Sequence, residues 1–261
     1  MKKLLKIQYD GTDFSGYQVQ PDRRTVQGEL NRALLDLFGF DCNVTGCSRT
    51  DSGVHALAFF CTIEPSGQGI ITVPNDNLPR ALNSHLPDDI SVICAYDVED
   101  SFHPRYDVID KEYTYCIYNY NVKAPFLRNR ALQLQKPLTD GQITRMSDAC
   151  RYLIGRHDFA SFMAEGSSVT DTVREIYDAR LERAMGIFGE DMLMLKIRGN
   201  GFLYNMVRII TGTLLEAAYS KISPSDVEKI ILSRDRALAG RTAPPHGLYL
   251  THVSYAEEWI K

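Results

Sequence analysis

The pattern of apolar and polar positions in the first hundred residues predicts helices set among strands. Between Val26 and Phe38 apolar residues recur every three to four positions, which is the spacing of an amphipathic helix. Thr25 stands where the helix N-cap belongs, and Gly39 stands just past the helix end. The predicted elements are, in order, a strand at 4–10, this helix, strands near 42–48 and 56–63, a short helix at 77–86 and a strand at 90–98. Their order is βαββαβ.

The second half of the chain repeats this order. Residues 111–119 alternate as a strand, and Thr139-Asp-Gly-Gln142 is a capping-box sequence that predicts a helix up to Ile154, stopped by Gly155. The remaining predicted elements are strands at 174–184 and 191–198 joined by a Gly186–Gly189 turn, a helix at 202–218, a short helix after Ser223-Pro224 and a strand at 248–254.

Two βαββαβ units predict an α+β fold made of duplicated ferredoxin-like or RRM-like halves. The sheets would be mainly antiparallel, with helices on one face and a central active-site cleft. We expect an N-terminal half at 1–104 and a C-terminal half at 105–261, with 100–110 as the hinge. The alternative is that two α+β halves share one element order by chance. In the duplicated fold the open sheet face is the kind that RNA-recognition domains use.

A polar cluster lies between two strand-like segments of the first half. Residues 46–56 read Gly-Cys-Ser-Arg-Thr-Asp-Ser-Gly-Val-His-Ala, so that Arg49, Asp51 and His55 fall within seven positions. An arginine two residues from a carboxylate favours its ionised form, which a nucleophilic or acid/base carboxylate needs. An ordinary Asx-type turn with a solvated arginine would have the same local sequence. As part of a catalytic site, the cluster would project into a cleft shared with the second half.

Composition and charge indicate a cytoplasmic globular protein. The apolar content is 44%, no apolar run approaches the length needed to span a membrane, and the N-terminus lacks the features of a signal peptide. The net charge of −4 allows RNA binding only through local basic patches. The six cysteines are scattered without paired spacing, which argues against a structural zinc site.

Several motifs resemble those of the tRNA pseudouridine synthase A family. They occur in the family's order along nearly the whole chain, and the run at 46–56 is the family signature; the family usually has glycine where Ser48 stands. The other matching blocks are Ile7–Gln20, Thr25-Val-Gln27, Phe102-His-Pro-Arg-Tyr106, Lys111–Tyr115, Asp158–Phe162, Phe202–Arg208 and Gly247–Leu250.

The resemblance implies that the chain converts uridine to pseudouridine at positions 38, 39 and 40 of the tRNA anticodon stem-loop. It also implies a homodimer in which one tRNA contacts both subunits, with no metal and no cofactor. Asp51 would be the nucleophile. Attack on the ribose C1′, assistance to base departure through a glycal, and addition to uracil C6 all remain open as routes.

The resemblance also assigns roles to residues outside the signature. Arg208 would pair with Asp51, and the ring of Tyr113 would stack on the flipped uracil while its hydroxyl could accept the C5 proton. Leu248 would pack against the base. The residues expected to fill the vacated stack or to hold the RNA backbone are Arg49, Arg105 and His103. The loop Met163–Thr172 is a further candidate tRNA contact.

Two other functions are consistent with parts of the sequence. A non-catalytic RNA-binding module would use the basic and aromatic residues but would have no need for Asp51. An aspartate-dependent hydrolase of small nucleosides would act on free uridine and would not depend on tRNA folding. Turnover by an Asp51→Asn variant separates the first of these from a synthase.

Overall fold

The computed structural model describes residues 2–167, 169–186 and 189–259. It divides into two compact units, the first comprising Met1–Asp110 with Leu250–Lys261 and the second comprising Lys111–Tyr249. None of the helices in the described part of the chain has the length and apolar character needed to span a bilayer. The two units are described separately below.

The first unit follows the predicted βαββαβ order. Its elements are β1 (Lys2–Tyr9), α1 (Val26–Phe38), β2 (Cys42–Gly46), β3 (His55–Pro65), α2 (Leu78–Asn83) and β4 (Ile90–Val98). In the sheet β1 lies between β4 and β3, with β2 on β3, and these pairings are antiparallel. This arrangement is that of a ferredoxin-like unit. Strand β10 (Leu248–Tyr255) neighbours β3 in the sheet, and its residues from Leu250 onward belong to this unit.

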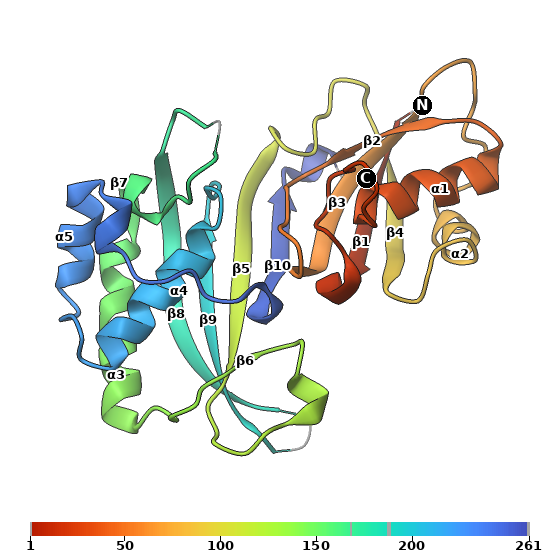
Figure 1. Cartoon of the computed structure of the whole chain (residues 1–261). Coiled ribbons are helices and arrows are strands. Elements are labelled where there is room, and N and C mark those ends of the chain that lie inside the picture. Colours follow the sequence, from red (N-terminus) through yellow and green to blue (C-terminus); the bar gives the residue numbers. More distant parts are fainter. Residues whose placement is uncertain (1, 168, 187–188, 260–261) are drawn as a thin grey trace. The chain divides into compact units, whose positions relative to one another are not determined.

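Helix α1 has the bounds that its capping residues predict. The Thr25 side chain accepts a hydrogen bond from the Gly28 N–H, and Gly39 closes the helix in the left-handed conformation at φ 74°. The residues of α1 that are buried are Val26, Leu30, Ala33 and Leu34. Helices α1 and α2 lie side by side in this unit (Figure 1). Burial of this apolar stripe holds α1 in place.

The second unit contains the antiparallel run β5-β9-β8-β7, with the short β6 parallel to β5. Its strands are β5 (Val108–Tyr118), β6 (Leu132–Gln133), β7 (Gly155–Asp158), β8 (Val173–Met185) and β9 (Asp191–Gly199). Its helices are α3 (Asp140–Cys150), α4 (Met206–Ala218) and α5 (Asp226–Ser233). The predicted capping box of Thr139 and Gln142 is present at the start of α3.

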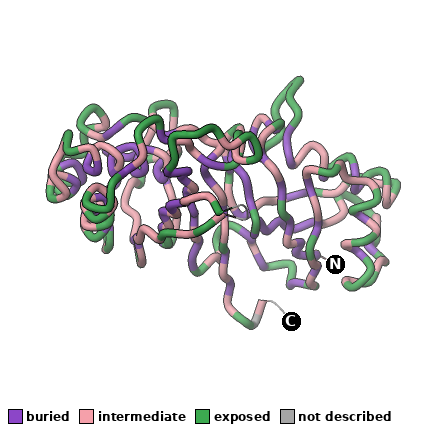
Figure 2. The backbone as a smooth tube through the Cα atoms, turned by 90° about the horizontal axis from the view of Figure 1, so that it is seen from below, coloured by how far each residue is buried: buried purple, intermediate pink, exposed green. Residues whose placement is uncertain are grey.

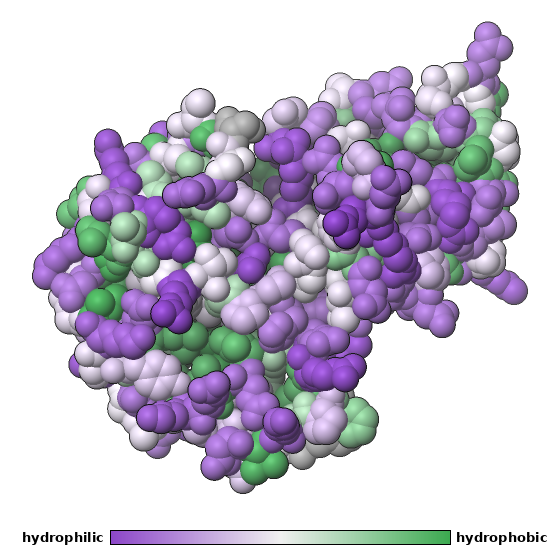
Figure 3. All heavy atoms as spheres, viewed as in Figure 1, coloured by the Kyte–Doolittle hydropathy of each residue, from purple (hydrophilic) through white to green (hydrophobic). Residues whose placement is uncertain are grey.

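Buried residues occur throughout both units (Figure 2), on the strands and, in the second unit, also along most of helix α4. On β9 the side chains of Leu193, Leu195 and Ile197 are fully buried on one face. Met192 belongs to a smaller cluster with Tyr118 and Ala131. The face of the first unit seen in Figure 3 is mostly hydrophilic.

Some predicted bounds were wrong. The helix predicted to reach Ile154 ends at Cys150 in a 3₁₀ turn, and Gly155 begins a strand, β7, that pairs with β8. The helix predicted from residue 202 begins at Met206, because Asn205 takes a left-handed conformation at φ 59° and breaks the run. The strand predicted at 42–48 ends at Gly46. The α+β class with mostly antiparallel strands is confirmed, whereas the duplication, the 1–104 and 105–261 division and the cleft stay predictions.

Candidate active site

The polar cluster forms the loop between β2 and β3, as its flanking apolar segments predict. Asp51 is half-buried in this loop, and Arg49 and Ser52 beside it are exposed. The loop is thus held at the end of two paired strands, where a scaffold can fix the direction of a side chain. We refer to residues 47–54 as the aspartate loop.

Thr50, which precedes Asp51, is held from two sides. Its hydroxyl lies 2.7 Å from the hydroxyl of Tyr9 in a buried hydrogen bond, and its carbonyl accepts the Tyr17 N–H at 3.1 Å. Gly16 lies so close that a Cβ there would meet the Thr50 carbonyl oxygen at 2.8 Å. The backbone on the N-terminal side of Asp51 is therefore fixed by β1 and by the segment that follows it.

The residues after Asp51 are held by Phe14. Its carbonyl oxygen accepts hydrogen bonds from the Ser52 hydroxyl at 3.1 Å and from the Gly53 N–H at 3.3 Å. A tight turn closes when the Val54 N–H donates to the Asp51 carbonyl at 3.1 Å. Gly53 makes the turn possible, because it sits at φ 78°, where a side chain would be strained.

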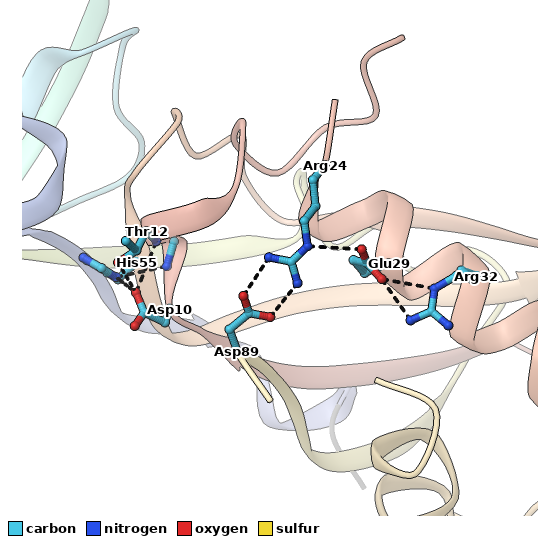
Figure 4. A network of polar contacts seen from close by, with 8 residues as sticks. Asp10, Thr12, Arg24, Glu29, Arg32, His55 and Asp89 are labelled. Carbon is cyan, nitrogen blue, oxygen red and sulfur yellow. Dashed lines mark hydrogen bonds and ion pairs between the residues drawn. The ribbon is translucent and has the colours of Figure 1, made fainter. Parts of the chain in front are cut away.

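His55, which follows the aspartate loop as the first residue of β3, belongs to a buried polar group. Its Nδ1 lies 3.0 Å from the Gly11 nitrogen and 3.0 Å from Oδ1 of Asp10, and its side chain is 1% exposed. The same Asp10 oxygen accepts the hydroxyl of Thr12 (Figure 4). In this position His55 holds the backbone of the loop and the end of β1 together.

The candidate RNA contacts His103 and Arg105 lie in one turn of the first unit. The His103 N–H donates to the Asp107 carboxylate at 2.6 Å, and His103 Nδ1 accepts the Arg105 N–H at 3.1 Å. The ring of Tyr106 lies on His103 with 4.2 Å between centroids, and its side chain is 74% exposed. We call residues 103–107 the His103 turn.

Aromatic packing ties the His103 turn to β3 next to the aspartate loop. The Tyr255 hydroxyl donates to the Pro104 carbonyl at 2.6 Å, and the Tyr255 ring makes edge contacts with Phe60 and Phe102. Burial raises the pKa of Tyr255, so its hydroxyl remains a donor. The Phe60 carbonyl in turn accepts the Cys47 N–H at 2.8 Å. The aspartate loop and the His103 turn are therefore both connected to Phe60 of β3, the first directly and the second through Tyr255.

Cys47 itself is fully buried, and its sulfur accepts the Phe60 N–H. This environment is that of a packing residue.

In the second unit Tyr113 stands in the middle of β5, opposite Ile197 of β9. Its side chain is 6% exposed, and its ring meets the edge of Phe202 with 5.1 Å between centroids. Phe202 belongs to the segment that leads into α4. Tyr113 is thus a buried aromatic residue that packs against the segment preceding α4.

Arg208 lies in the first turn of α4 and is held on several sides. Its Nε donates to the Ala243 carbonyl at 2.8 Å, and a guanidinium nitrogen donates to the Asn205 side chain. The Ala243 N–H returns a hydrogen bond to the Arg208 carbonyl at 3.0 Å. The half-buried guanidinium is therefore fixed in direction by neutral acceptors.

Tyr115 lies in the same unit as Arg208 and Leu248. Burial raises the pKa of Tyr115, and the positive charge of Arg208 acts in the opposite direction. The Tyr115 hydroxyl donates to the Pro244 carbonyl at 2.8 Å, and Gly247 lies against its ring. Leu248 follows directly and is buried. Tyr115 and Phe202 lie within the motifs that resemble the family, but the sequence pattern assigns neither of them a role of its own.

The structure thus collects the predicted residues into two groups. Asp51, Arg49, His103 and Arg105 belong to the first unit, and Tyr113, Arg208 and Leu248 belong to the second. In the loop Met163–Thr172, residue 168 lies outside the described residues, and the role of this loop stays a prediction. Among the described residues, no group of three or more His, Cys, Asp or Glu side chains is arranged to hold a metal ion.

Comparison with known proteins gives full-length matches. The profile of the family described as "tRNA pseudouridine synthase" matches residues 6–107 and 149–256. A protein of Thermoanaerobacter sp. (strain X514) named "tRNA pseudouridine synthase A" is 45% identical over 252 residues, which is 97% of this chain and 98% of that protein. One of the same name from Bacillus pumilus (strain SAFR-032) is 43% identical over 257 residues, covering 98% of this chain and 99% of the relative.

Among solved structures, one titled "Crystal Structure of a Cbf5-Nop10-Gar1 Complex" matches with a TM-score of 0.34 and 9% identity, over 95% of this chain and 58% of that one.

Proposed function

The chain belongs to the tRNA pseudouridine synthase family, and from this premise we propose that it isomerises uridines 38, 39 and 40 of the tRNA anticodon stem-loop. Enzymes of this kind are isomerases that convert uridine to pseudouridine. The bond between the ribose C1′ and uracil N1 breaks, a bond from C1′ to C5 forms, the C5 proton is released to solvent and N1 takes up a proton, so that the product is an isomer of the substrate. The resemblance at residues 46–56 and in the other motifs supports the choice of the anticodon stem-loop.

Asp51 is the nucleophile in this proposal. The observation that carries it is the hydrogen bonding of the aspartate loop, which fixes the backbone on both sides of a half-buried carboxylate. A carboxylate held in one direction costs less reorganisation when it attacks. Attack at C1′, a glycal route and addition to C6 are all compatible with this arrangement.

Tyr113, Arg208 and Leu248 complete the catalytic and base-binding set. Arg208 supplies a fixed positive charge that favours the ionised form of Asp51. Tyr113 and Leu248 offer apolar surface to the flipped uracil, and the Tyr113 hydroxyl is a candidate acceptor for the C5 proton. The hydrogen bonds that fix Arg208 support its role, because they leave its orientation determined before substrate binds.

Arg49, His103 and Arg105 bind the RNA in this proposal. The uridine lies in or next to a stem and must be flipped out, at a cost of a few kcal/mol that RNA contacts offset. Arg49 and Arg105 are exposed, as phosphate-binding or stack-filling residues must be. The exposed ring of Tyr106 joins this set, since aromatic rings beside arginines are the usual platform for unstacked bases.

The assembly expected from the motif resemblance is a cytoplasmic homodimer that binds one tRNA across both subunits. A dimer of this chain would contain two polypeptides of 29.5 kDa. Sedimentation velocity of the purified protein distinguishes this dimer from a monomer of 29.5 kDa.

Turnover of Asp51→Asn tests the function. We expect the variant to fold and to bind tRNA as the wild type does, while its turnover falls by about 1000-fold or more, because a nucleophile has no substitute in its own step. Release of tritium from tRNA labelled as [5-³H]uridine measures it. Near-wild-type release would exclude Asp51 as nucleophile.

The same assay separates the two other functions. An RNA-binding module would bind tRNA and release no tritium even as the wild type. A nucleoside hydrolase would act on free uridine, which a synthase specific for folded tRNA leaves unchanged.

A further inference from the structure

We propose that Arg24 is a positioning residue for Asp51, acting through the Phe14 ring and carbonyl on the aspartate loop. The inference rests on the proposed function of Asp51. It concerns the segment 11–24, which we call the clamp segment and which links β1 to α1. Arg24 has no part in the roles assigned above.

The clamp segment contacts the aspartate loop on both sides of Asp51. Phe14 and Tyr17 hydrogen bond to loop residues after and before Asp51, as described above. At the start of the segment, Gly11 lies so close to Val54 that a Cβ would meet the Val54 carbonyl oxygen at 2.0 Å. The position of Asp51 therefore depends on the position of this segment.

Asp89 holds both ends of the clamp segment. Its carbonyl accepts the N–H of Asp10, just before the segment, at 2.9 Å. Its carboxylate accepts two hydrogen bonds from the Arg24 guanidinium at 2.7 Å and 2.8 Å (Figure 4). The segment is thus closed as a compact loop by one residue that directly precedes β4, and fixing its ends reduces its conformational freedom.

Arg24 also covers the residue that carries the hydrogen bonds to the loop. Its guanidinium carbon lies 4.1 Å from the centroid of the Phe14 ring. The two-pronged bond to Asp89 fixes the plane of the guanidinium, and the ring beneath it is 2% exposed. Arg24 therefore restrains Phe14, whose carbonyl accepts the Ser52 and Gly53 donors.

A simpler role for Arg24 is an ordinary surface ion pair. Arg32 is the matched control for that role, since it is exposed on α1 and pairs with Glu29 and Asp36 but with nothing in the clamp segment that the structure describes. Glu29 joins Arg24 and Arg32 in one network (Figure 4). Exposed pairs of this kind contribute little. The two arginines thus differ in their contact with Phe14 and Asp89.

The test compares Arg24→Ala with Arg32→Ala in the full-length protein. For Arg24→Ala we expect kcat for tritium release to fall about 10-fold and KM for tRNA to change less than about twofold. A small displacement of the reacting carboxylate lowers the rate of the chemical step but leaves the affinity for tRNA nearly unchanged. Arg24→Lys, which keeps a cation over the ring but loses the fork, should retain part of the rate. Arg32→Ala should behave as the wild type.

Amide hydrogen exchange of the Gly53 N–H gives a readout independent of turnover. We expect faster exchange in Arg24→Ala and in Asp89→Ala, no further change in the double variant, and wild-type exchange in Arg32→Ala. If Arg24→Ala does not fold, Arg24→Lys carries both measurements.

Wild-type kcat and exchange in a folded Arg24 variant would overturn the proposal, as would a rise of KM with unchanged kcat, which would make Arg24 an RNA contact. Loss of exchange protection in Arg24→Ala together with an inactive wild type would support the positioning and refute the proposed function instead.

Discussion

At the scale of single residues, Tyr113 has a packing role in the structure and a role in the reaction in the proposed function. Its ring packs on Phe202, and the proposed function asks the same ring to stack on uracil. We expect Tyr113→Phe to lose less turnover than Tyr113→Leu, with about a 10- to 100-fold difference, because stacking on one base is worth about 1–3 kcal/mol. Tritium release under single-turnover conditions measures both variants.

The control for this prediction is Tyr118→Phe on the same strand. Tyr118 packs with Ala131 and Met192 and has no proposed contact with substrate, so this variant should keep wild-type turnover. Equal and complete loss in Tyr113→Phe and Tyr113→Leu would show instead that the hydroxyl carries the proton transfer.

At the scale of elements, the clamp segment and helix α1 depend on glycines for different reasons. Gly16 sits at φ 89° and a Cβ would meet Thr50, whereas Gly39 sits at φ 74° with open space around it. We expect Gly39→Ala to lower the free energy of unfolding by about 1–2 kcal/mol from backbone strain. Gly16→Ala should lower it by more, because its Cβ also meets the Thr50 carbonyl oxygen. Only Gly16→Ala should also lower kcat, because it displaces the carbonyl of Thr50.

Urea denaturation and tritium release on the same preparations separate these effects. Equal loss of kcat in both glycine variants would mean that global stability, and not the contact with Thr50, limits turnover.

How far the sequence predicts this fold depends on whether its signals are local. The ends of α1 follow from the capping residues Thr25 and Gly39, and the prediction was confirmed. Strand β7 was missed, because its four residues form a strand only through pairing with β8, and Gly155 was interpreted as a helix stop alone. The start of α4 was also missed. Asn205 ends the preceding segment by its left-handed conformation, and an asparagine gives no clear break signal in the sequence.

The candidate site likewise has one part that the sequence predicts and another part that it does not. The position of Asp51 between two strands was predicted from the apolar segments around it and was confirmed. The clamp segment could not be predicted, because it holds the aspartate loop largely through main-chain carbonyls and amides, which any sequence has. The His103 turn is anchored by a hydrogen bond from Tyr255 to Pro104, a contact between residues far apart in the chain that no local sequence pattern indicates.

At the scale of the whole molecule, a chain with a net charge of −4 must bind a polyanion through a few local contacts. The logarithm of the tRNA association constant should therefore fall with the logarithm of salt concentration, with a slope that counts phosphate contacts. Arg105 and Tyr106 are adjacent in the His103 turn and differ in charge, so they separate the two kinds of contact.

We expect Arg105→Gln to weaken tRNA binding and to reduce the salt slope by about 1, because it removes one neutralised phosphate. Tyr106→Ala should weaken binding by about 1–3 kcal/mol with an unchanged slope, since stacking releases no counterion. Arg151→Gln is the control, because Arg151 is an exposed arginine already paired with Asp148. Filter binding of tRNA to inactive Asp51→Asn protein at several salt concentrations measures all three. A slope that changes in Tyr106→Ala, or that stays the same in Arg105→Gln, would remove the His103 turn from the RNA-binding surface.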